Sequence, residues 1–161
     1  MRPLHPILVH FPISLLLAAV MVDLASLRRP TNPVMRETVT WLYCVVAAMT
    51  LAAYFSGLSG ATTLRLSPTA SPDVTTHFVW ADWATWVLVC VAALRLALSY
   101  IWQTTGRWVA AMVWVAGLFA LALLLMTATH GGRLVFEHGL GVGSAPITGQ
   151  RWTIPDVGPD P

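Results

Sequence analysis

Four long stretches of apolar residues restrict what this chain can fold into. They cover residues 7–27, 38–58, 76–101 and 107–129. A helix needs about 20 mostly apolar residues to cross the hydrocarbon core of a bilayer, and each stretch is long enough. A soluble domain carries about 25% charged residues, whereas this chain carries 10% and is 57% hydrophobic. We therefore expect an all-α integral membrane protein with four transmembrane helices.

The links between the stretches predict how the helices are arranged. Residues 28–37 and 102–107 form short links, and residues 59–75 form a longer one. Short links favour a four-helix bundle of up-down-up-down topology. Residues 1–130 are expected to form this transmembrane domain. Residues 131–161 are rich in glycine and proline and are expected to form an extracytoplasmic tail along the outer surface.

Arginine predicts the orientation, since the chain contains no lysine. The two short links carry four arginines in about sixteen residues, and the opposite side carries Arg2, Arg65, Arg133 and Arg151 over about three times that length. The positive-inside rule then places the short links in the cytoplasm and both termini outside it. The net charge of +2 and the lack of a basic stripe argue against a nucleic-acid partner.

All five histidines fall on the predicted outer side. His5 and His10 begin the first helix, His77 begins the third, His130 ends the fourth, and His138 follows in the tail. On the third helix, His77 shares a stripe with the small residues Ala84 and Ala92, and small residues line helix contacts in membranes. Polar side chains in a span normally point inward. We expect His10 and His77 to face each other across the interior from diagonal helices.

Two imidazoles on different helices of a bundle suit bis-histidine ligation of haem. The preferred axial pair is His10 with His77, and His130 with His5 or His138 is the second candidate pair for the iron. Met126 is an alternative axial ligand. The sequence has no C-x-x-C-H motif, so the haem b, one or two per chain, would be bound without covalent attachment. Side chains available to bind its propionates are Arg65, Arg133 and Arg151.

Several other polar residues have structural interpretations. Asp23 and Arg95 lie at similar depth near the inner ends of the first and third helices, and an unpaired charge there costs several kcal/mol. We therefore predict a structural ion pair between them. Asp82 is expected to accept a hydrogen bond from a ligating histidine. Cys44 and Cys90 are expected to be small packing residues.

Two other functions remain open. His130, His138 and Glu137 could bind a divalent metal. Alternatively, the chain is a non-redox membrane anchor or assembly subunit of a larger complex. Motifs of hydrolases, phosphate loops and zinc proteases do not occur in the sequence. An electron-transfer subunit is thus favoured over a stand-alone enzyme.

Both ends of the bundle resemble one family. Residues 4–13, LHPILVHFPI, and residues 129–142, THGGRLVFEHGLGV, are similar to the opening and closing motifs of the domain of unknown function 2231 family. These are four-helix bacterial membrane proteins. Thr129, Phe136 and Leu140 stand where the family has glycine, tyrosine and valine. The resemblance covers residues 3–143.

The resemblance also bears on function. Relatives are fused to Rieske iron–sulfur or other redox domains, which implies electron transfer in a bacterial inner membrane. Our leading hypothesis is that the protein passes electrons between a periplasmic redox protein and quinone or cytochrome c. The family's histidines correspond to His5, His10, His77, His130 and His138 in this sequence.

Overall fold

The computed structural model describes residues 5–28, 32–61, 65–66, 70–102, 106–140 and 150–151. Its two short strands, β1 (Arg65–Leu66) and β2 (Gln150–Arg151), pair antiparallel, which the sequence did not predict. The other elements are helical and confirm the expected all-α fold. They are α1 (His5–Leu8), α2 (His10–Ser26), α3 (Pro33–Ala61), α4 (Ser71–Leu96), its π-helical continuation η1 (Ala97–Ile101) and α5 (Arg107–Phe136).

Local sequence signals explain where the helices begin. Asn32 caps α3, because its side-chain oxygen accepts hydrogen bonds from the backbone N–H groups of Val34 (3.1 Å) and Met35 (3.2 Å). Pro33 follows at the first helical position, where its missing N–H costs nothing. Proline also lies in the first turn of α4, so this helix begins at Ser71 rather than near residue 76.

The last helix is longer than predicted. The apolar stretch ends at Thr129, before two glycines, but α5 continues through Gly131 and Gly132 to Phe136. The expected boundary of the tail at residue 131 therefore lies inside a helix.

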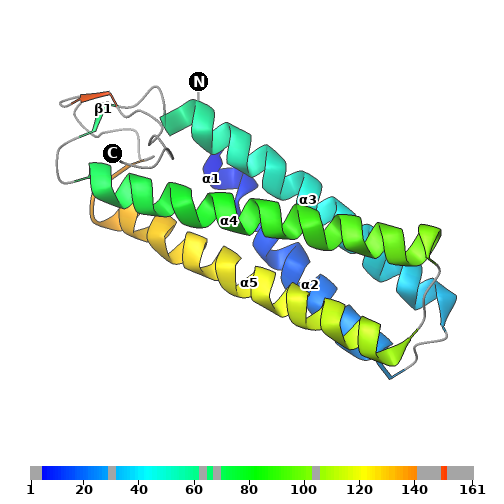
Figure 1. Ribbon diagram of the computed structural model, residues 1–161. Coiled ribbons are helices and arrows are strands. Elements are labelled where there is room, and N and C mark those ends of the chain that lie inside the picture. The colour runs from blue at the N-terminus through cyan, green and yellow to red at the C-terminus, as the bar shows by residue number, and fades with distance from the viewer. Residues whose placement is uncertain are drawn as a thin grey trace, which may run out of the picture.

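Helices α2, α3, α4 and α5 lie side by side as a bundle, with α2 and α4 on opposite corners (Figure 1). Hydrogen bonds fix the direction of neighbours. Near the start of α3, Thr40 bonds to Ser99 in η1 (2.9 Å), and near its end Tyr54 bonds to Asp82 in α4 (3.0 Å). Neighbouring helices α3 and α4 are therefore antiparallel.

The interior of the bundle is apolar apart from a few threonines and one ion pair. Leu16, Val46, Leu88 and Ala120 are fully buried, one from each helix. Each buried threonine hydroxyl donates to the carbonyl four residues earlier in its own helix, and Thr40 also bonds to Ser99 of η1. The buried threonines are Thr40, Thr50 and Thr85.

Helix lengths and the outer surface fit a lipid bilayer. Three helices are long and apolar enough to cross a membrane: α3, α4 with η1, and α5, with mean hydropathy of 1.6, 1.9 and 2.5 over their most apolar windows. The fourth apolar helix, α2, has 17 residues. Large apolar side chains are exposed along the bundle, among them Trp83 (62%) on α4.

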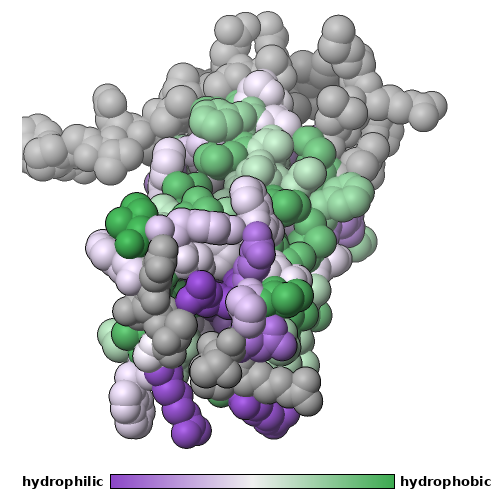
Figure 2. All heavy atoms as spheres, turned by 90° about the vertical axis from the view of Figure 1, so that its right-hand side faces the viewer, coloured by the Kyte–Doolittle hydropathy of each residue, from purple (hydrophilic) through white to green (hydrophobic). Residues whose placement is uncertain are grey.

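One end of the bundle is charged. Figure 2 looks at the end where α2 and α4 finish, and hydrophilic side chains gather in its lower part, with apolar ones above. Arg28, Glu37 and Arg107 are exposed at this end, which we call the arginine end. The opposite end carries His5, His77, His130 and His138 and is called the histidine end.

Candidate functional site

His5 is held at the histidine end by contacts with α3. Its Nδ1 lies 2.9 Å from the carbonyl oxygen of Ala53 and 3.1 Å from Oγ of Ser56. The ring packs against Gly57, where an added Cβ would lie only 2.7 Å from Cε1 of the imidazole. These contacts hold the imidazole against the backbone of α3.

His77 makes an equivalent set of contacts with α5. Its Nδ1 lies 3.0 Å from the carbonyl oxygen of Thr127. Its ring packs against Gly131, where an added Cβ would lie 3.1 Å from Cε1. The glycines therefore let the two imidazoles lie against the backbones of α3 and α5.

These hydrogen bonds determine what the two rings can do. A carbonyl oxygen only accepts, so Nδ1 carries the proton in both His5 and His77. Each Nε2 then keeps its lone pair and is available as a metal ligand. Metal-ligating histidines usually donate their other ring N–H to a carbonyl or carboxylate, which fixes the tautomer and the ring orientation. The two rings thus carry this ligand-orienting feature.

The other histidines of this end have different neighbours. The ring of His130 stacks on Trp80, with centroids 6.3 Å apart and planes 10° apart. Nε2 of His138 lies 2.7 Å from Oδ2 of Asp73 at the start of α4. Sequence reasoning missed Asp73, because it expected the helix to begin after it.

His10 does not face His77 as expected. It is exposed, while the buried residues of α2 form a stripe on another side of the helix. At 100° per residue, His10 lies about 135° from the centre of that stripe. Packing of apolar residues sets the rotation of α2, and His10 points away from the interior. The buried residues that form this stripe are Pro12, Leu16, Ala19, Val20 and Asp23.

The arginines expected near haem propionates are only partly described. Arg133 is paired with carboxylates: its Nε lies 3.1 Å from Glu137, and its Nη2 lies 3.8 Å from Asp73. The backbones of Arg65 and Arg151 lie opposite each other in the β1–β2 ladder. Their side chains are outside the described part of the chain.

Two further candidates also have neighbours that differ from those expected. Oδ1 of Asp82 accepts hydrogen bonds from the Tyr54 hydroxyl and the Trp86 indole, both at 3.0 Å, rather than from a histidine. Met126 is exposed on α5. Of the predicted ligands, His5 and His77 thus share the same kind of contact, in which Nδ1 bonds to a main-chain carbonyl.

The predicted ion pair lies toward the arginine end. Asp23 and Arg95 are in direct contact and buried. Arg95 also lies over the ring of Tyr43, 4.7 Å from its centroid. Tyr43 is fully buried, and its hydroxyl has no hydrogen-bond partner among the described residues. It fits against Gly117, where an added Cβ would lie 2.0 Å from the hydroxyl oxygen. No pattern in the sequence indicates that Tyr43 is part of this cluster.

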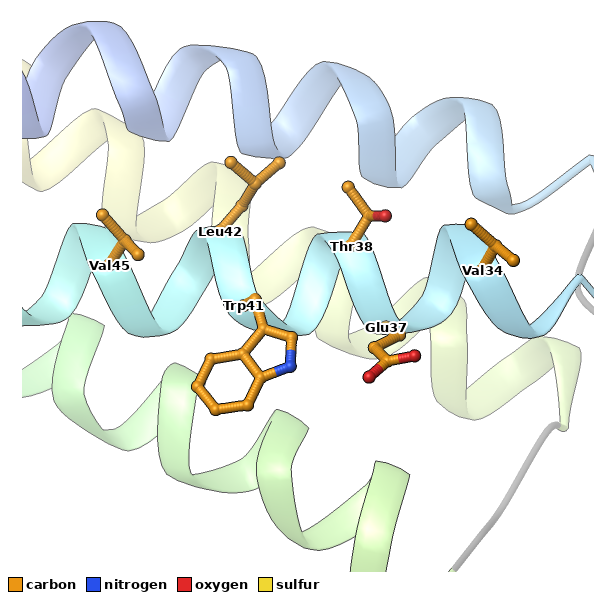
Figure 3. A pocket seen from close by; sticks show the side chains of 6 residues that line it. All are labelled: Val34, Glu37, Thr38, Trp41, Leu42 and Val45. Carbon is orange, nitrogen blue, oxygen red and sulfur yellow. The ribbon is translucent and has the colours of Figure 1, made fainter.

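A shallow groove lies near the arginine end and is separate from the histidines. In Figure 3 its lining comes from one side of α3, with Trp41 and Glu37 toward α4 and the aliphatic residues toward α2. Most of these side chains are exposed, so this groove is a feature of the lipid-facing surface. The residues are Val34, Glu37, Thr38, Trp41, Leu42 and Val45.

Comparison with known proteins agrees with the helices and the two end motifs. No curated protein and no solved structure shows significant similarity to the chain. The family described as "Predicted membrane protein (DUF2231)" matches residues 1–144. Since this match includes all four long helices and the histidine end, the chain belongs to the DUF2231 family of predicted membrane proteins.

Proposed function

We propose that this protein is a membrane b-type haem electron-transfer protein or subunit, with His5 and His77 as the axial ligands. The observation that carries the proposal is the shared hydrogen-bonding state of these two rings. Both donate Nδ1–H to a main-chain carbonyl and keep Nε2 as a free ligand atom. This pair takes the place of the pair expected from the sequence, His10 and His77, because His10 is exposed on the far side of α2.

The surroundings of the two rings fit axial ligation. Gly57 and Gly131 let the imidazoles lie against α3 and α5. The ligating nitrogen of a histidine must be unprotonated, and donation of Nδ1–H to a carbonyl leaves Nε2 in that state. When bound, a haem supplies one-electron transfer, and its potential depends on the axial ligands and on burial. His130 also lies at the histidine end, where its ring stacks on Trp80.

We also propose that all four helices span the membrane. From His5 to Ser26, α1 and α2 cover 22 residues, or about 33 Å at 1.5 Å per residue, which matches a bilayer core of about 30 Å. Arg28, Arg36 and Arg107 favour a cytoplasmic arginine end in a bacterial inner membrane. The histidine end and both termini then face the periplasm, where a redox protein exchanges electrons and quinone or cytochrome c is the second partner.

An absorption spectrum of the full chain, purified in detergent from haem-supplied cells, tests the proposal. We expect a Soret band with reduced α and β bands of low-spin bis-histidine haem. His77→Gln and His5→Gln should lose the band or shift it to a high-spin form. His10→Gln is the matched control and should keep the wild-type spectrum. Circular dichroism of each variant verifies that the helices are intact.

Two results would refute the haem assignment. One is a colourless wild-type protein that also fails to bind added haemin. The other is a Soret band that survives unchanged in both His77→Gln and His5→Gln while the helices remain intact. A colourless, folded protein that copurifies with a membrane complex would instead support the anchor or assembly role.

A further inference from the structure

A second group of possible metal ligands lies where α4 begins and α5 ends. Asp73, Glu137 and His138 each place one ligand atom within 4.8 Å of the others. His138 and Asp73 are half-buried, with side-chain exposures of 17% and 26%. The group differs from the site expected from the sequence, because Asp73 takes the place of His130, which stacks on Trp80 instead.

The end of α5 fixes the position of His138. Gly139 adopts a φ of 65°, a left-handed conformation that glycine reaches without strain. Its N–H donates to the carbonyl of Val135, and the N–H of Leu140 donates to that of Leu134, both at 3.0 Å. Leu140 packs with Val74, the residue after Asp73. This cap therefore holds His138 next to the first turn of α4.

Arg133 presently neutralises the carboxylates of the group. Its guanidinium bonds to both oxygens of Glu137, at 3.1 and 3.3 Å, and lies 3.8 Å from Asp73. The side chain is 50% exposed. Exposed ion pairs contribute little stability, and a long arginine side chain can turn into solvent. A stronger cation can therefore replace it at the carboxylates.

The geometry points to a binding site for Zn²⁺ formed by Asp73, Glu137 and His138, with Arg133 as the cation that the metal displaces. One imidazole nitrogen and two carboxylate oxygens suit Zn²⁺, whereas Mg²⁺ and Ca²⁺ prefer oxygen ligands alone. This inference goes beyond the haem proposal and uses none of its axial ligands.

Isothermal titration of the full chain in detergent with ZnCl₂ tests the site. We expect one Zn²⁺ per chain and no comparable binding of Mg²⁺. His138→Gln, Asp73→Asn and Glu137→Gln should each weaken binding by about tenfold or more. Arg133→Gln should tighten it by about fivefold, because a unit charge at 4 Å contributes about 1 kcal/mol even in water. Glu37→Gln, at the opposite end, is the control.

The Arg133 variant gives opposite results for a metal site and for a purely structural ion-pair cluster. If the cluster is only structural, Arg133→Gln lowers the melting temperature and leaves Zn²⁺ binding no tighter than in wild type. That result, or Zn²⁺ binding that is equal in wild type and His138→Gln, would overturn the proposal. The visible spectrum of His138→Gln separates the two sites, since the loss of Zn²⁺ binding should leave any Soret band unchanged.

Discussion

Gly117→Ala should destabilise the bundle because this glycine makes room for the Tyr43 hydroxyl. A Cβ at position 117 would lie 2.0 Å from the hydroxyl oxygen and 3.0 Å from Cζ of the ring. The ring cannot easily retreat, since Tyr43 is fully buried and Arg95 lies against its face at 4.7 Å. Either the ring or helix α5 must move by more than 1 Å.

The size of the effect follows from two opposing contributions. Overpacking a filled interior costs up to about 3 kcal/mol, and replacing a helical glycine by alanine returns about 1 kcal/mol. The net loss should be about 2 kcal/mol. Tyr43→Phe alone should be neutral or stabilise by about 1 kcal/mol, because it removes a buried hydroxyl that has no described partner. In the Tyr43→Phe background the nearest atom is Cζ, so Gly117→Ala should cost less than about 1 kcal/mol.

A double-mutant cycle measured by reversible denaturant unfolding in detergent tests this reasoning. The two substitutions should show a coupling energy of about 1–2 kcal/mol, typical of residues in contact. If Gly117→Ala costs the same in both backgrounds, the hydroxyl does not occupy the space beside the glycine and the argument fails. Circular dichroism of the four proteins verifies that all remain helical.

Two further outcomes are expected. Asp23→Asn should cost about 3–5 kcal/mol of unfolding free energy, because it leaves Arg95 unpaired. The double change Asp23→Leu with Arg95→Leu should recover most of this free energy. A double variant as unstable as Asp23→Asn would contradict the pairing. Gly131→Ala should lower the melting temperature through the imidazole packed against it, whereas Gly132→Ala, with open space at its Cβ, should raise it.

Features that depend on counting along a helix could be predicted from the sequence. Asp23 and Arg95 were paired from their depths alone, and the structure contains that contact. The stripe of α4 was also correct, because Ala84 and Leu88 are buried while Trp83 is exposed. A regular helix has a known angle per residue, so relative positions on one helix follow directly.

Features that depend on tertiary contacts could not be predicted. The helical angle does not determine how α2 is rotated against its neighbours. The sequence therefore predicts His10 inside the bundle, whereas His10 is exposed and His5 contacts α3. Glycines usually end a helix, but Gly131 continues α5 while His77 packs against it. The contact between Asp73 and His138 joins residues 65 positions apart, and no local pattern indicates it.

The threonines of the interior have a consequence for how charge can move through this protein. Between the histidine end and Asp23, the fully buried layer holds apolar side chains such as Leu16 and Leu88, and Thr50 and Thr85 are bonded within their own helices. The fully buried Tyr43 hydroxyl has no hydrogen-bond partner among the described residues, so the described polar side chains of this layer form no continuous path for a proton. Moving one charge across a whole membrane involves about 2.3 kcal/mol per 100 mV. An electron that enters and leaves at the histidine end crosses little of that field, so turnover in proteoliposomes should not change with an imposed voltage.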